Sequence, residues 1–246
     1  MSEVGITDGL VAWYPLNGNS IDLEQHKRHA TIGSGNVSYQ PAFDGKIGAG
    51  FNGSSHLQVT NFYNPSHADS VFLGSSPQTT NNWSGDSTYS AWVKPGSVDS
   101  THRFVFCDNN YNEGYISFRT SSIYCNWGSG NVLNYSIAVD PNKWYHVIMW
   151  HQRDDVNDLF RLKLYIDGVL RGNTTTSISG SGSWYGPDNR LVIGHLLNGI
   201  VSDVRIYGRC LSDEEVGILY NATKPNPTKM QMTSTGLYIS GEFKEV

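Results

Sequence analysis

The chain has 246 residues, of which 38% are hydrophobic, 12% aromatic and 16% charged, and its formal net charge is −5. This length fits one large all-β sandwich or two small domains, and 26 glycines with 9 prolines exclude collagen-like and Pro/Gly-rich disordered chains. No basic run exceeds Lys27-Arg28, so the electrostatic footprint of a nucleic-acid binder is missing. We therefore expect no nucleic-acid partner.

Apolar and polar residues alternate with period two along most of the chain, which predicts short strands separated by Gly, Asn and Ser loops. The expected strands cover 10–15, 57–60, 88–93, 103–107, 115–120, 122–126, 144–151, 159–166, 190–194 and 200–207. Asp167-Gly168 predicts a type I′ hairpin turn, because both central residues of that turn need positive φ. Many short strands without a βαβ rhythm predict an all-β, antiparallel two-sheet sandwich.

One helical signal follows the last strand. Ser212 as N-cap, with Glu215 three residues later, forms a capping box, and Val216, Leu219 and Tyr220 share the face that follows. The sequence therefore predicts one short helical turn near the C-terminus.

The character of the chain changes after the helical signal. Residues 221–228 hold two prolines and no periodicity, which predicts a linker and divides the chain into a domain at 1–220 and a tail at 221–246. The tail alternates weakly and predicts at most a small hairpin, a unit that is marginal alone in water. It packs on the sandwich, frays, or is completed by another chain; we favour the last, because its apolar residues need a partner surface.

The cysteines Cys107, Cys125 and Cys210 are odd in number and form no C-x-x-C motif, so we interpret them as buried apolar residues and not as a disulfide framework. Residues 1–8 lack the basic start and apolar stretch of a secretory signal, and no apolar run reaches the roughly 18 residues of a membrane span. We expect no membrane insertion.

Three stretches occur in a characteristic order: Gly-Leu-Val-Ala-Trp-Tyr-Pro-Leu-Asn-Gly-Asn at 9–19, Ser-Ala-Trp-Val-Lys-Pro at 90–95, and the closing segment 199–212. Together they resemble the laminin-G-like, concanavalin-A-like jelly-roll family, in the branch common in bacterial and phage surface proteins. The resemblance covers about residues 8–220. It implies two antiparallel sheets packed face to face as a jelly roll.

The resemblance also implies a structural calcium held by an acidic loop after the first strand and an Asp in the closing strand. Here Asp22 is followed by a segment without the family's glycines, Ser202 replaces the first acidic residue of the closing strand, and Asp203 points to the opposite strand face. Calcium prefers several carboxylates among six to eight oxygens, so we expect this site to be weakened or lost. We predict no metal ligands and no cofactor, and a structural calcium is the alternative.

No catalytic set is found. Paired carboxylates at the spacing of a retaining glycosidase are missing, as are the G-x-x-x-x-G-K, G-x-S-x-G and H-E-x-x-H motifs. The acidic run 154–158 fits a solvated turn, and His26-x-x-His29 fits a surface loop because Lys27 and Arg28 oppose a cation. We therefore expect no enzyme.

Aromatic residues stand among Asn, Ser and Gly in several predicted loops. Aromatic faces stack on sugar rings while Asn and Asp bind hydroxyls, which is the chemistry of a glycan site. For each residue alone we favour a loop anchor folded onto the sandwich, but we expect at least one of the set to lie in a binding surface. The candidate ligand-binding residues are Trp83, Tyr111, Trp127, Trp184 and Tyr185.

The leading hypothesis is a non-catalytic phage virion structural protein, a decoration, fibre or adhesin subunit at the virion surface, assembled in the host cytoplasm. Its expected partners are glycans on host or environmental surfaces and other subunits, contacted through the termini. The alternative is a secreted bacterial carbohydrate-binding module or lectin, extracellular or at the cell surface. A glycosidase or lyase on the same fold would need an acid/base pair that the sequence does not show.

Overall fold

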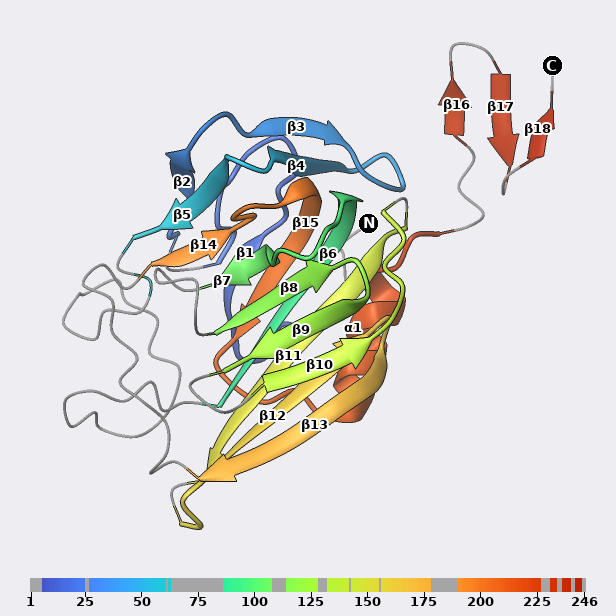
Figure 1. The fold of residues 1–246 in the computed structure, drawn as a ribbon. Helices are drawn as coiled ribbons and strands as arrows, with labels where there is room; N and C mark the ends of the chain where they lie inside the picture. The colour runs from blue at the N-terminus through green and yellow to red at the C-terminus, as the bar shows by residue number, and fades with distance from the viewer. Residues whose placement is uncertain are drawn as a thin grey trace.

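The computed structural model describes residues 6–24, 27–60, 62, 86–107, 114–127, 132–141, 143–154, 156–177 and 190–226, together with the backbone of 231–233, 236–239 and 242–244. Two antiparallel sheets lie face to face, which confirms the expected jelly-roll sandwich (Figure 1). No helix among the described residues is long and apolar enough to cross a membrane.

The first sheet has eight strands in the order β13-β12-β11-β6-β15-β4-β3, with β1 also paired to β15. The strands are β1 (Leu10–Tyr14), β3 (Ser38–Pro41), β4 (Ile47–Asn52), β6 (Ser87–Ser97), β11 (Tyr145–Asp154), β12 (Leu159–Ile166), β13 (Val169–Ser177) and β15 (Asn198–Tyr207). Asp167 and Gly168 join β12 to β13 with φ of 53° and 75°, which confirms the predicted type I′ turn.

The second sheet has seven strands in the order β10-β9-β8-β7-β14-β5-β2. The strands are β2 (Thr31–Ser34), β5 (His56–Val59), β7 (Arg103–Cys107), β8 (Tyr115–Arg119), β9 (Ser122–Asn126), β10 (Val132–Ser136) and β14 (Leu191–Ile193). All ten expected strands are present, with ends shifted by at most a few residues. The alternation did not reveal β2, β3, β4 and β10, whose residues are mostly exposed or, in β4, include glycines that weaken strand propensity.

The core lies between the sheets and takes every second residue of the central strands. Val147 and Met149 of β11, Ile116 and Phe118 of β8, and Ile123 of β9 are fully buried within it. Burial at this spacing follows from the strand period of two, since the alternate residues must point to the outer face. The intervening residues of these strands therefore form the outer faces of the two sheets.

Strand β15 changes partner along its length. Its first half pairs with β4 and its second half with β1, and the ladder to β6 is irregular between Ser202 and Arg205. Asp203, at this irregularity, has φ of 52°, a conformation that Asp tolerates better than most residues.

Helix α1 (Asp213–Thr223) packs on the outer face of the eight-stranded sheet. Ser212 and Glu215 form the expected capping box, and Val216 and Leu219 are buried against that face. The indole Nε1 of Trp92 donates a hydrogen bond of 3.0 Å to the hydroxyl of Thr223. The domain boundary predicted near 221 therefore falls inside the last turn of α1, which ends at Thr223.

The tail forms a three-stranded sheet of its own, β16 (Gln231–Thr233), β17 (Gly236–Ile239) and β18 (Glu242–Lys244). The sequence predicted at most a hairpin, because the short third strand carries little alternation. The tail strands are hydrogen-bonded to neither large sheet (Figure 1). All three cysteines are thiols, as the sequence indicated, and Cys107 and Cys125 are buried.

Candidate functional site

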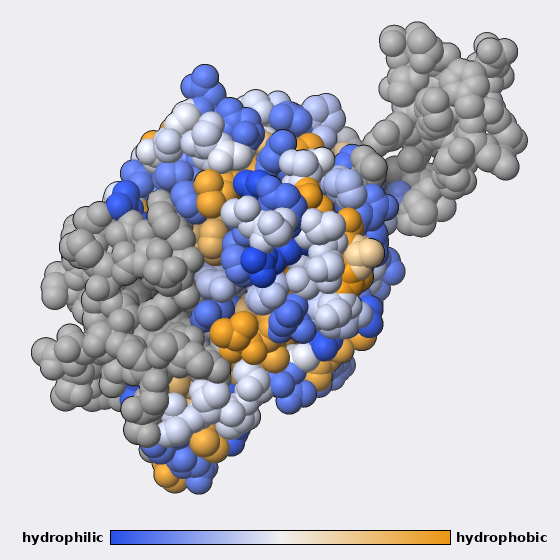
Figure 2. Space-filling model, in the orientation of Figure 1, coloured by the Kyte–Doolittle hydropathy of each residue, from blue (hydrophilic) through white to orange (hydrophobic). Residues whose placement is uncertain are grey.

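The outer faces of the two sheets differ in how they are covered. Ile148, Trp150 and Tyr165 on the eight-stranded sheet are buried beneath α1 and the segment before it. On the seven-stranded sheet, the outer face of β8, β9 and β10 carries polar side chains. Figure 2 shows hydrophilic residues there, interspersed with small hydrophobic patches. This polar face holds the candidate site.

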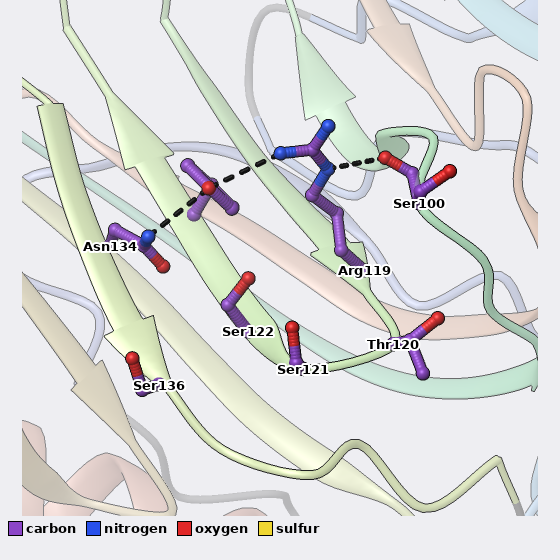
Figure 3. Close-up of a pocket in the computed structure, with 8 residues that line it drawn as sticks. Ser100, Arg119, Thr120, Ser121, Ser122, Asn134 and Ser136 are labelled. Atoms are coloured by element: carbon purple, nitrogen blue, oxygen red, sulfur yellow. Dashed lines mark hydrogen bonds between the residues drawn. The ribbon is translucent and has the colours of Figure 1, made fainter.

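A pocket of about 300 Å³ opens on this face, where the chain turns from the end of β8 into the start of β9 (Figure 3). Its size is at the lower end of the range of small-molecule sites. It is lined by Ser100, Arg119, Thr120, Ser121, Ser122, Tyr124, Asn134 and Ser136, and we call this set the Arg119 pocket.

The register of the three strands brings the pocket together. Asn134 of β10 lies opposite Tyr124 of β9, and Ser136 lies opposite Ser122. Arg119 ends β8 opposite Ser122, two residues from Tyr124 along β9, which allows a diagonal contact across the strands. The neighbouring Phe118 and Ile123 point into the core, so the pocket residues necessarily point outward.

Arg119 is held in place by neutral groups. Its Nε donates to the carbonyl oxygen of Ser100 at 2.6 Å, and its Nη1 donates to the Tyr124 hydroxyl at 3.2 Å (Figure 3). The guanidinium carbon lies 5.2 Å from the centroid of the Tyr124 ring, a cation–π arrangement. Asn134 Nδ2 donates to the same hydroxyl at 3.1 Å. The guanidinium is thus fixed before any ligand arrives.

The ring of Tyr124 packs against the neutral imidazole of His102. The His102 ring meets the Tyr124 ring edge-on at 4.9 Å between centroids, and His102 Nδ1 lies 2.6 Å from the Ser117 hydroxyl. Burial, and then the charge of Arg119, lower the pKa of His102. A neutral imidazole therefore supports the aromatic ring at neutral pH and adds no charge to the pocket.

The predicted ligand-binding residues are distributed differently. Trp83, Tyr111, Trp184 and Tyr185 lie outside the described residues. Trp127 is only 3% exposed, its ring stacks on His151 at 4.3 Å, and it belongs to the core. The prediction of Trp127 as a ligand-binding residue is wrong, because this side chain anchors the end of β9 in the sandwich.

The Arg119 pocket was not predicted from the sequence. The pattern did predict β8 and β9, but their outward residues were interpreted as the ordinary polar half of the alternation. A usable signal was present: Arg119 is followed by Thr120, Ser121 and Ser122 with no acidic residue near it in sequence.

The two carboxylates nearest to the calcium position that the family resemblance implies accept hydrogen bonds within the protein. Asp22 is buried, and its carboxylate accepts hydrogen bonds from the backbone N–H groups of Trp13, Glu24 and Arg28. Asp203 accepts from the Trp13 indole at 2.6 Å and from Arg205 Nε at 2.9 Å. Within the described ranges, no group of three or more His, Cys, Asp or Glu side chains could hold a metal.

The other acidic and histidine motifs have local partners. Asp154 accepts from Asn157 and pairs with Arg161 at 3.0 Å, the arrangement expected of a turn. His29 Nδ1 accepts from the backbone N–H of Asp22, while His26 and Asp155 lie outside the described residues.

A family model described as "Concanavalin A-like lectin/glucanases superfamily" matches residues 65–217, more than half of the chain. The chain belongs to this superfamily. The match agrees with the resemblance seen in the sequence and with the sandwich. No curated protein matches the chain.

Among solved structures, domain 4 of AbnA, an extracellular GH43 arabinanase from Geobacillus stearothermophilus in complex with arabinotriose, is similar at 18% identity. The likeness has a TM-score of 0.60 and covers 86% of this chain and 98% of that one. The binding domain of botulinum neurotoxin DC in complex with rat synaptotagmin II is similar at 16% identity with a TM-score of 0.62. This likeness covers 92% of this chain and 55% of that one. The same toxin domain in complex with SialylT is similar at 15% identity with a TM-score of 0.62. This likeness covers 91% of this chain and 54% of that one.

At these identities the likenesses show the fold alone. The chain spans about half the length of the toxin domains and nearly all of the arabinanase domain. Of these structures, the arabinanase domain is therefore the one matched over nearly its full length. The neighbours are mainly binding domains.

Proposed function

We propose that this domain is a non-catalytic carbohydrate-binding module whose sugar site is the Arg119 pocket. One observation carries the proposal: the pocket is preorganised by Arg119, Tyr124 and Asn134, yet most of its polar groups have no protein partner. The side-chain hydroxyls of Ser100, Thr120, Ser121, Ser122 and Ser136 make no hydrogen bond among the described residues. Hydroxyls and an amide around a fixed aromatic ring match the hydroxyls of a sugar.

Absence of a carboxylate from the lining supports binding over hydrolysis. Glycoside hydrolysis requires an acid and a second carboxylate on either side of the scissile bond. The Arg119 pocket contains neither Asp nor Glu. Among the solved neighbours, the arabinanase domain is in complex with arabinotriose, which fits a binding module of this fold.

The proposal is tested by titrating an isotope-labelled sample with a panel of oligosaccharides and mapping the NMR shifts. Shifts centred on β8 to β10 are expected, and Tyr124→Ala should reduce the affinity at least about tenfold, since a stacked and hydrogen-bonded ring is lost. Tyr39→Ala on the exposed edge strand β3 is the matched aromatic control. Sugar-induced shifts confined to other surfaces would overturn the assignment of the site.

A second role, as a virion structural subunit, is supported by the C-terminal sheet. Its three strands pair only with one another within the described chain, so both of its edges are open to a partner. Three thiols without a disulfide fit assembly in a reducing compartment. We propose that the tail joins this domain to neighbouring subunits, on a virion or another assembly. In the alternative, in which the protein is an extracellular lectin, the same tail contacts another domain.

The assembly role is tested by removing residues 227–246. This cut keeps Thr223 and its contact with Trp92, and it keeps the hydrogen bond from the Asn226 backbone to Asp44. Light scattering should show a smaller oligomer for the shortened chain, with an unchanged melting temperature. An unchanged mass would contradict a role of the tail in assembly, and the glycan site would be unaffected by that result.

A further inference from the structure

We propose that the Arg119 pocket selects acidic sugars and that Arg119 binds their carboxylate. This inference rests on the proposed carbohydrate-binding function and specifies its ligand class. It depends on the charge of the pocket and on which donors the protein leaves open.

Arg119 differs from four other described arginines, including Arg103, in having no acidic partner among the described residues. Arg161, Arg205 and Arg209 pair with Asp154, Asp203 and Glu215 at 2.6 to 3.0 Å. Within the part of the chain that the structure describes, Arg119 contacts only the Ser100 carbonyl and the Tyr124 side chain. In a chain of net charge −5, a fixed cation in an acid-free pocket is available to an external anion.

The open donors of the pocket suit a carboxylate. Nε and one N–H of Nη1 are used, whereas Nη2 makes no hydrogen bond to the described residues and points away from both partners (Figure 3). The Tyr124 oxygen accepts from Arg119 and from Asn134, so its own proton is free to be donated elsewhere. Nη2 and the Tyr124 hydroxyl therefore offer donors from two side chains to the two oxygens of one carboxylate.

The rest of the pocket suits the sugar that carries the acid. Ser122 and Ser136 are a cross-strand pair beside the Tyr124 and Asn134 pair, and Arg119 lies opposite Ser122. Two hydroxyls therefore continue the row of the guanidinium across the sheet. The Asn134 side-chain oxygen accepts no hydrogen bond from the described residues and can bind a sugar hydroxyl. A single arginine balances one negative charge, which favours a carboxylate over a doubly charged phosphate.

The test compares probes that share a neutral core: sialyllactose, lactose and sulfated lactose, with trigalacturonate as a second carboxylate. NMR titration should place the carboxylate probes on β8 to β10 and show weaker or no binding of lactose. Because a charge-assisted hydrogen bond contributes about 1.5–3 kcal/mol, Arg119→Gln should weaken the carboxylate probes by about 10-fold or more.

Two further variants keep the test interpretable. Asn134→Asp places a carboxylate beside Arg119 at an exposed position and should reduce acidic binding without unfolding the domain. Arg171→Gln is the matched control, because Arg171 stacks on Tyr135, forms no ion pair with the described residues and does not line the pocket.

The outcomes separate the two proposals. Equal binding of lactose and sialyllactose at the pocket, unchanged in Arg119→Gln and Asn134→Asp, would overturn the acidic class while supporting the carbohydrate site. Preference for sulfated lactose over both carboxylates would overturn the carboxylate assignment. Absence of any pocket shift with all four probes would overturn the acidic class, and the broader neutral panel would then decide the carbohydrate site.

Discussion

Two arginines stack on aromatic rings on the outer faces of the two sheets, in different surroundings. Arg205 lies 4.6 Å from the Trp13 ring, is 2% exposed, and pairs with the Asp203 carboxylate. Arg119 lies 5.2 Å from the Tyr124 ring, is half-buried, and has only neutral partners within the described residues. The same contact is therefore part of a buried ion pair on one sheet, whereas on the other it leaves a cation without an acidic partner among the described residues, which is the basis of the proposed site.

The largest effect is expected from Asp203→Asn, which keeps a residue that tolerates positive φ but removes the negative charge. The variant leaves Arg205 buried without its carboxylate, so the free energy of unfolding should fall by about 3–5 kcal/mol. Urea unfolding at neutral pH measures this. Asp203→Asn combined with Arg205→Met should recover much of the loss, and a single-variant loss below about 1 kcal/mol would contradict the structural role.

Lowering the pH should also reduce the free energy of unfolding, through two buried or partly buried histidines. Burial lowers the pKa of His146 to about 3, and burial followed by the charge of His56 lowers that of His195 to about 4. Both folded values lie below about 6.5, the value in an unfolded chain, so the unfolded state binds more protons below that pH. Stability is therefore fully present above about 6.5 and falls as the pH drops toward the folded values.

Urea midpoints across this pH range should show a smaller slope in His195→Gln than in the parent chain. An identical slope would contradict the assignment of this pH dependence to His195.

Thr223→Val tests where the sandwich domain ends. The variant removes the acceptor of the Trp92 indole and keeps the side-chain shape, so unfolding should become easier by about 1–2 kcal/mol. Trp92→Phe combined with Thr223→Val should cost little more than either alone. No change in the melting curve would place Thr223 outside the cooperative unit.

Arg119→Gln should change stability least among the charged variants, by less than about 1 kcal/mol, because the residue is half-buried and pairs with no carboxylate. Thermal unfolding beside Asp203→Asn measures the difference directly. A loss as large as that of Asp203→Asn would mean that Arg119 belongs to the fold, and it would weaken the case for a ligand.

Chelator should have no effect on the melting temperature. The carboxylates of Asp22 and Asp203 already accept hydrogen bonds from Trp13 and other donors. We therefore propose that the sandwich folds without a calcium ion bound to these two carboxylates. A fall in the melting temperature with chelator, restored by added calcium, would show a metal site elsewhere in the chain.

Local features of the sequence determined much of the fold. The turn at Asp167-Gly168 and the capping box at Ser212 depend on the torsion angles and hydrogen bonds of a few consecutive residues. Ten of the strands follow from a period of two, and the resemblance of the motifs to a known family predicted the sandwich. These signals are present in short stretches, so the sequence alone carries them.

Tertiary structure decided the site. Arg119, Tyr124, Asn134 and Ser100 come from three strands and a loop, and only the register of β8, β9 and β10 brings them to one place. Trp127 looked like a ligand residue because it stands beside a Gly and Ser loop, whereas packing against His151 buries it. A polar residue on a strand has the same local pattern whether its partner is water, a carboxylate or an open pocket, and only long-range pairing distinguishes these.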